Sequence, residues 1–368
     1  MRTVGVEEEL LLVSATTGEP LAVSSAVLAA AAAGAGADDA DGGFEKELHQ
    51  EQLEFATRPL SGMSELREEI VRWRGEAARH AREAGARVAA LATSPLPVEP
   101  SRNPGRRYRW MAEQFALTTR EQLTCGCHVH VSVESDEEGV AVLDRIRPWL
   151  PLLNAISGNS PFWDGRDTGY SSYRSRVWNR LPSAGPYEPF GSAEGYHARV
   201  RDMLATGVLR DTGMIYFDAR LSHTYPTVEI RVADVCLEPD TTVLVATLAR
   251  GLVETAARAW RAGDPPARIP VGLLRLASWR AARSGLQGPL LDPRSMRETP
   301  AGAALDALLE HTDAALDATG DRDRARRALT ALTGRGGGAR RQRDLHRGGR
   351  DLGEVVRECA RITVGDGT

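Results

Sequence analysis

The chain has 368 residues, of which 42% are hydrophobic and 26% are charged, a composition typical of a globular protein that buries a core. Its formal net charge of -4 argues against a general nucleic-acid binder, because such proteins need an excess of positive charge to contact phosphates. Lys46 is the only lysine, so an anion site must use arginine side chains or backbone NH groups, and not a P-loop lysine.

Cysteine usage and hydropathy indicate the cellular compartment in which this protein is expected. The four cysteines (Cys125, Cys127, Cys236 and Cys359) are too few for a disulfide framework in a chain of this length. No run of 18 uncharged apolar residues is present, and the first residues lead into an acidic strand that does not resemble a signal peptide. We therefore expect a cytoplasmic protein without membrane contact.

Hydrophobic periodicity and helix-breaking residues predict strands and helices that mix without a regular βαβ rhythm. The predicted strands cover residues 4–13, 52–57, 127–133 and 227–232. The predicted helices cover residues 22–33, 64–92, 108–117, 140–157 with a break at 148–151, 241–261 and 301–318, and a final helix closes the chain. Loops are predicted at residues 34–43, at 159–189 and at 335–350, the second long enough to be functional. This pattern favours an antiparallel α+β architecture in one domain, residues 1–368.

Acidic residues cluster in the segment Gly5-Val6-Glu7-Glu8-Glu9. Residues two apart on a strand share a face, so Glu7 and Glu9 point one way and Glu8 the other. Apolar flanking residues indicate a buried strand, in which neighbouring carboxylates need a cation or a proton between them. A solvated acidic edge strand is the alternative interpretation.

A second acidic segment places Glu54 in a short strand between Leu53 and Phe55, with Glu47 just upstream. Glu47, Glu51 and Glu54 also fit the spacing of a helix, so a charged helix face is the alternative here.

The run Cys125-Gly126-Cys127-His128-Val129-His130 offers four possible zinc ligands within six residues. Strand alternation argues against their joint use, because the two cysteines face one side and the two histidines the other. The histidine pair is therefore the better candidate ligand set, the alternative being two buried histidines with satisfied partners.

The strand after Tyr225 and Pro226 carries Glu229 and Arg231 on one face. They form either an internal salt bridge or a metal-ligand glutamate beside an arginine that neutralises a phosphate or carboxylate. Together with the preceding segments they make an oxygen-rich ligand set with imidazole, which suits Mg²⁺ or Mn²⁺ better than zinc. Several carboxylates indicate more than one metal, as expected for phosphoryl transfer.

These segments, read in order, resemble the carboxylate–amine ligases of the glutamate–cysteine ligase type 2 family, relatives of glutamine synthetase and of the gamma-glutamylcysteine synthetases. The resemblance rests on GVEEE at residues 5–9, EFAT at 54–57, HVHV at 128–131, NSPFWDGRDTGYSSYRSRVW at 159–178, YPTVEIRVAD at 225–234 and GARRQR at 338–343. It implies a glutamine synthetase-like fold, a curved antiparallel β-sheet funnel backed by helices. It also implies an ATP-dependent ligase that joins an amino-acid carboxylate to an amine through an acyl phosphate, with Mg²⁺ or Mn²⁺.

The resemblance also implies roles for individual residues. Glu7, Glu47 and Glu54 would hold the metal near the amino-acid substrate, and Glu9, His128 and Glu229 the metal bound by the nucleotide phosphates. His130 and Arg231 would lie beside the transferred phosphoryl group. Candidate substrate-binding residues are Asn159, Arg174 and Arg176, and candidate nucleotide-binding residues in the 335–350 loop are Arg340, Arg341 and Arg343. For these arginines a structural ion pair or a solvated loop is the alternative.

One segment of the chain departs from the pattern of the family, and the difference concerns the choice of substrate. Many relatives carry Thr-His-Pro where this chain has Thr93-Ser94-Pro95, so glutamate and cysteine should not be assumed as substrates. The partners expected are a small amino acid and an amine, with a homo-oligomer such as a dimer as the assembly. The rival functions are a phosphotransferase related to the guanidino kinases, which would phosphorylate its substrate without forming an amide, and a non-catalytic binding protein of the same fold.

Overall fold

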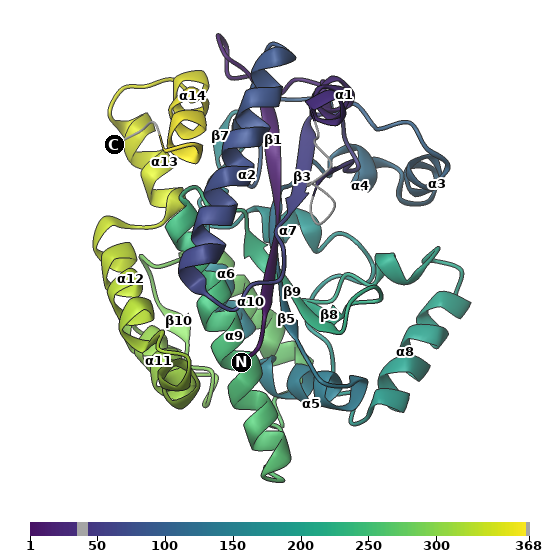
Figure 1. The fold of residues 1–368 in the computed structure, drawn as a ribbon, viewed down its shortest axis with the longest axis vertical. Coiled ribbons are helices and arrows are strands. Elements are labelled where there is room, and N and C mark those ends of the chain that lie inside the picture. Colours follow the sequence, from purple (N-terminus) through teal and green to yellow (C-terminus); the bar gives the residue numbers. More distant parts are fainter. Residues whose placement is uncertain (35–42, 366–368) are drawn as a thin grey trace.

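The computed structural model describes residues 1–34 and 43–365, and an antiparallel sheet of seven strands lies at its centre (Figure 1). The strand order is β2-β3-β1-β5-β9-β8, and β4 pairs with the far end of β1. Every pairing is antiparallel, which confirms the predicted α+β class. The strands are β1 Val4–Ser14, β2 Phe44–Glu45, β3 Gln52–Ala56, β4 Ala86–Ala89, β5 Gly126–Ser132, β8 Ala219–Leu221 and β9 Thr227–Asp234. Two small hairpins pair β6 Phe162–Trp163 with β7 Arg166–Asp167, and β10 Leu290–Leu291 with β11 Glu298–Thr299.

Helices cover one face of this sheet. α2 (Met63–Glu83), α6 (Leu150–Ser157), α9 (Pro239–Arg261) and α14 (Leu352–Thr363) pack on its strands and on one another. Their apolar residues and those of the strands form two buried clusters. Among the described helices, none combines the length and the apolar character that crossing a bilayer requires.

The other helices surround this centre. α3 and α4 lie beside β3, α8 lies beyond β8, and α11 to α14 follow one another along the opposite side (Figure 1). Their bounds are α1 Ser24–Gly34, α3 Arg106–Phe115, α4 Leu117–Arg120, α5 Asp136–Ile146, α7 Arg174–Trp178, α8 Ala193–Ala205, α10 Val271–Ser284, α11 Ala301–Ala318, α12 Arg322–Arg335 and α13 Gly338–Arg347, with a 3₁₀ turn at Thr212–Met214.

The helix predicted over residues 64–92 is wrong in its second part. α2 ends at Glu83, and Gly85 follows with a positive φ of 74°. Glycine takes this left-handed conformation at little cost, so it ends the helix. The chain then returns as β4, whose residues pair with β1. The alanines there fit a helical pattern, and only the pairing with β1 makes the segment a strand.

The predicted Gly/Arg-rich loop at 335–350 is also wrong. α12 stops at Gly336, which has a φ of 83°, and the chain re-enters a helix at Gly338. Ala339 and Gln342, three residues apart, form its buried face. The Gln342 amide donates to the backbone oxygen of Asn159 (2.9 Å), so a tertiary contact holds this polar helix in place.

The predicted irregular segment at 159–189 contains the β6–β7 hairpin and α7. Of the loop predicted over residues 34–43, residues 35–42 lie outside the described residues.

Candidate active site

The face of the sheet turned away from α2 and α9 carries a cluster of charged side chains. Register places Glu7 opposite His128 on β5, Glu9 opposite Glu54 on β3, and His130 opposite Glu229 on β9. Directly opposed residues of antiparallel strands have their Cβ atoms about 5 Å apart, so each pair shares one environment. The cluster lines a pocket of about 350 Å³.

Strand alternation sends the residues between them to the opposite face. Glu8 is buried, and its Oε2 accepts from Arg74 Nε on α2 at 2.8 Å. Cys125 and Cys127 are buried free thiols packed in the two apolar clusters. The predicted separation of the cysteines from the histidine face is therefore confirmed, and the two thiols are not on the face that carries the histidines.

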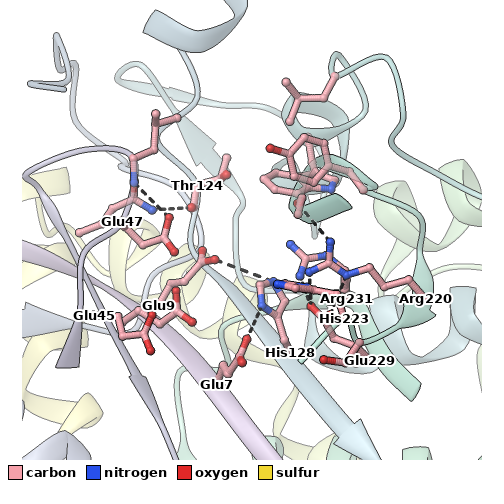
Figure 2. Close-up of a pocket in the computed structure, with 18 of the residues that line it drawn as sticks. Glu7, Glu9, Glu45, Glu47, Thr124, His128, Arg220, His223, Glu229 and Arg231 are labelled. Atoms are coloured by element: carbon pink, nitrogen blue, oxygen red, sulfur yellow. Dashed lines mark hydrogen bonds and ion pairs between the residues drawn. The ribbon is translucent and has the colours of Figure 1, made fainter. Parts of the chain in front are cut away.

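Glu7, His128 and Glu229 form the first set of possible metal ligands, with ligand atoms that all lie within 4.8 Å of one another. Glu7 Oε2 lies 3.1 Å from His128 Nδ1 (Figure 2). Burial would raise the pKa of the Glu7 carboxyl, but hydrogen bonds with His128 and His130 outweigh it and hold that pKa well below its usual range. Burial and the charge of Arg231 lower the pKa of His128 to about 4, so its imidazole is neutral near pH 7.

Glu9, Glu47 and Glu54 form the second set, again with ligand atoms within 4.8 Å of one another. Burial and the charge of Glu47 raise the pKa of Glu9 to about 7. Burial, together with a hydrogen bond and the charge of Glu47, also raises the pKa of Glu54 well above its usual range. Three carboxylates this close can remain together only with a shared proton or a cation between them.

Both sets fit divalent cations. Nε2 of His128 is buried without a hydrogen-bond partner among the described residues, and Glu9 Oε1 lies 3.8 Å from it. A neutral imidazole with a free lone pair, set among carboxylates, is a typical donor arrangement for Mn²⁺ or Mg²⁺. The predicted partition of the ligands between two metals stays a prediction. By proximity Glu7 lies with His128 and Glu229, and Glu9 lies with Glu47 and Glu54, as the register of β1 between β3 and β5 dictates. Nε2 of His128, however, is 3.8 Å from Glu9 Oε1, so Glu9 also borders the first set.

Glu229 lies between two arginines at the wall of the pocket (Figure 2). Arg231 is its neighbour on the strand, and both groups are buried. The two guanidinium charges hold the pKa of Glu229 well below its usual range despite burial. Arg220 on β8 was missed by sequence reasoning. Its Nε donates to Glu229 Oε2 at 2.7 Å, and its position directly opposite Glu229 follows from a β8–β9 hairpin that the sequence did not reveal.

His130 lies further along β5, between Thr227 and Glu7. Its Nδ1 lies 2.9 Å from the hydroxyl of Thr227, and its Nε2 lies 3.2 Å from Glu7 Oε1. Burial would lower the pKa of His130, but the hydrogen bond with Glu7 and its charge outweigh it, so the pKa is raised. His130 therefore favours the protonated form more than His128 does, and the two histidines are suited to different tasks.

The predicted substrate-binding residues do not line this pocket. Asn159 is buried, and its amide nitrogen donates to the carbonyls of Ala90 and Val235, both at 2.8 Å. Its Oδ1 accepts from Gln342, so this amide has structural partners for all its polar atoms. Arg174 is buried, 4.0 Å from Asp234, and its guanidinium lies over Gly126 on the face of the sheet that carries His128. Arg176 lies on the same short helix, half-buried.

The predicted nucleotide-binding arginines lie on α13, and the pocket lining does not include them. Arg343 forms a two-pronged ion pair with Asp167, at 2.6 and 2.8 Å. Arg340 lies 3.5 Å from Asp344 within the helix, and Arg341 is exposed. Ser94 also lies elsewhere: its hydroxyl donates to the carbonyl of Leu96, and the residue lines a separate cavity of about 720 Å³.

Several lining residues were not among the predicted site residues. α3 contributes Arg107, Tyr108 and Met111, and the end of α7 contributes Trp178. The helix predicted over residues 108–117 corresponds to α3, but its place over the sheet depends on contacts such as Tyr108 Oη to the carbonyl of Lys46, at 3.1 Å.

Comparisons with known proteins all point to the same family of ligases. Residues 3–361 match the family described as glutamate-cysteine ligase family 2. A relative from Streptomyces avermitilis, provisionally named glutamate–cysteine ligase 2-1, is 64% identical over 99% of this chain and 100% of its own length. One from Streptomyces coelicolor, provisionally named glutamate–cysteine ligase 2, is 62% identical over 99% of each chain. Among solved structures, a glutamate–cysteine ligase from Francisella tularensis in complex with AMP has a similar fold. Its TM-score is 0.68 at 12% identity, covering 99% of this chain and 89% of that one.

Proposed function

This chain belongs to the glutamate-cysteine ligase family 2, and we propose that it joins an amino-acid carboxylate to an amine through an acyl phosphate, with hydrolysis of ATP to ADP and phosphate. The proposal includes two divalent cations, Mg²⁺ or Mn²⁺, in the two ligand sets. Its principal support is the pair of clusters, Glu7 with His128 and Glu229, and Glu9 with Glu47 and Glu54.

The need for cations follows from charge. The pocket concentrates carboxylates on its floor, and ATP would bring further negative charge to the same place. A divalent cation in each set would neutralise phosphate charge and polarise the group that is transferred. Among the described residues, Nε2 of His128 accepts no hydrogen bond, and a cation would give it a partner. The same charge would offset the crowding that raises the pKa of Glu9.

Arg231 is the residue proposed to stabilise the transferred phosphoryl group. It is buried, and its guanidinium faces the pocket beside Glu229 (Figure 2). A fixed cation in a site of low dielectric stabilises charge that develops during transfer more strongly than it would in water. A carboxylate oxygen of the acid would attack the γ-phosphorus, and ADP would leave.

His130 is proposed to act next to this group. Thr227 orients the ring through Nδ1, and the proximity of Glu7 favours its protonated form. A protonated imidazole there can donate to a phosphoryl oxygen. The amine would then attack the acyl carbon, and inorganic phosphate would leave. Activation is needed because a free carboxylate is a poor electrophile.

The experiment is to incubate the protein with ATP, Mg²⁺ and a panel of amino acids and amines, and to identify the products by mass spectrometry. We expect ADP, phosphate and an amide in equal amounts, and no product after chelation of the metal. Release of AMP and pyrophosphate would exclude the acyl phosphate, because these products indicate an adenylate. A phosphorylated product without an amide would favour the guanidino-kinase-like phosphotransferase.

A further inference from the structure

Three arginines line the pocket within the described part of the chain, and two of them are paired with Glu229. Arg231 lies next to the ligand sets and is the residue proposed to meet the phosphoryl group. Arg220 donates to both oxygens of Glu229, at 2.7 and 3.2 Å, and to the carbonyls of Gly213 and Ile215. Arg220 therefore cannot turn to a new anion without disrupting the wall of the pocket.

Arg107 on α3 differs from them. Its side chain is 38% exposed, and within the described residues its hydrogen bonding is to one group, a single oxygen of Asp211. The other oxygen of Asp211, Oδ1, is buried and has no hydrogen-bond partner in the part of the chain that the structure describes. The pair therefore uses one arm of the guanidinium fork and one oxygen of the carboxylate, and it lies partly in solvent.

Such a pair is exchangeable. Ion pairs with both members partly exposed contribute little to stability, about 1 kcal/mol or less. A carboxylate that meets both arms of an arginine fork binds more strongly and with a defined orientation. A ligand carboxylate inside the pocket can therefore compete with Asp211 for Arg107.

The surroundings of Arg107 indicate what such a ligand contains. Met111 on the same helix, Trp178, Leu181 and Tyr216 line the pocket between polar ends and offer an apolar wall. The acidic ligand sets lie on the floor of the same cavity of about 350 Å³. A small molecule with a reacting group at the metal sets, a short aliphatic part and a free carboxylate matches this arrangement.

The loop that carries Asp211 is connected to the catalytic wall. Arg220 Nη1 donates to Gly213 O at 3.1 Å and to Ile215 O at 3.0 Å, just after Asp211 in the chain. The same Arg220 holds Glu229. Arg220 therefore connects the loop that carries Asp211, the partner of Arg107, to Glu229 in the first ligand set.

We propose that Arg107 binds the carboxylate of a substrate that does not react, in exchange for Asp211. This inference rests on the proposed ligase function and names a specificity-determining residue for it. This carboxylate can be a second acid group of the substrate that is phosphorylated, or it can belong to the amine substrate. The experiment below distinguishes these two sources.

Binding is measured by calorimetry with Mg²⁺ and a non-hydrolysable ATP analogue present. The probes are two pairs that differ by one carboxylate: L-glutamate with 4-aminobutyrate, and L-cysteine with cysteamine. In one of the two pairs, Arg107→Met should weaken binding of the compound that bears the extra carboxylate about tenfold or more. The dissociation constant of the compound that lacks it should stay unchanged. Loss with glutamate assigns the carboxylate to the acid, and loss with cysteine assigns it to the amine.

Two further variants separate this role from a structural one. Asp211→Asn removes the competing charge, so the same probe should bind about twofold to fivefold more tightly. Arg106→Met is the matched control, because Arg106 is exposed on the same helix and does not line the pocket. It should bind all four probes like the wild type. Melting temperatures verify that each variant is folded.

The inference is overturned if Arg107→Met changes the affinity for both members of each pair equally, or changes neither affinity. It is also overturned if the wild type binds the two members of each pair with equal affinity. Failure of the proposed function gives a different result, since it appears as a wild-type protein that forms no amide in the product assay, whatever Arg107 does to binding.

Discussion

Glu-to-Gln substitutions at neighbouring positions of β1 should have different effects, because Glu8 faces the helical layer and Glu9 faces the pocket. Glu8 points into the helical layer, where Arg74 donates to both of its oxygens at 2.8 Å and Thr242 donates at 2.6 Å. Both Glu8 and Arg74 are fully buried. Glu8→Gln keeps the size of the side chain but leaves the guanidinium without a counter-charge.

The expected cost is large. Removing one partner of a buried ion pair destabilises a protein by about 3 to 5 kcal/mol, because the other charge stays buried. With an unfolding entropy of about 2.1 cal/mol/K per residue, a chain of 368 residues should melt about 5 °C lower. Glu83→Gln is the control, since Glu83 pairs with Arg79 at the surface with half of its side chain exposed. That pair should contribute less than about 1 kcal/mol.

Glu9→Gln, one residue further on, should behave in the opposite way. Glu9 is crowded by Glu47, and removing its charge relieves repulsion in the metal-free protein. We expect a melting temperature equal to or above that of the wild type, together with loss of activity. Scanning calorimetry with a chelator, and turnover with Mg²⁺, test both statements. A Glu8→Gln protein that melts within about 1 °C of the wild type would refute the reasoning about the buried pair.

Four further predictions concern the pocket. Arg231→Lys keeps the charge but loses the planar fork, so turnover at saturating ATP and metal should fall on the order of 100-fold with an unchanged melting temperature; full activity would remove the role of the fork. His128→Ala should abolish turnover and weaken Mn²⁺ binding, measured by electron paramagnetic resonance, while circular dichroism stays native. Cys127→Ser should leave metal content and activity unchanged, because its side chain faces the apolar core, and a metal lost with this thiol would contradict the strand geometry. Finally, the pKa of Glu9 is raised from its ordinary 4.5 to about 7, so the folded state holds a proton that the unfolded state releases. The metal-free protein should therefore lose stability as pH rises from about 4.5 to about 7, in proportion to the protons released on unfolding, and Glu9→Gln should flatten this slope in denaturant titrations.

The two faces of the central strands could be predicted from the amino-acid sequence alone. Side chains alternate along a strand whatever surrounds it, so the separation of Glu7 and Glu9 from Glu8, and of the histidines from Cys125 and Cys127, could be predicted locally. Motifs spread along the whole chain also indicated the family, because a motif consists of consecutive residues and can be recognised without the fold.

How these residues combine into sites depends on long-range contacts that the sequence did not reveal. Register between strands far apart in the chain groups Glu7 with His128 and Glu9 with Glu54, and no local pattern encodes register. The β8–β9 hairpin brings Arg220 onto Glu229, and the docking of α3 brings Arg107 to the pocket. The same holds for α13, where contacts with Asn159 hold a polar, glycine-flanked segment as a helix. Local preferences specify which way a side chain points, whereas long-range pairing and packing specify what it meets.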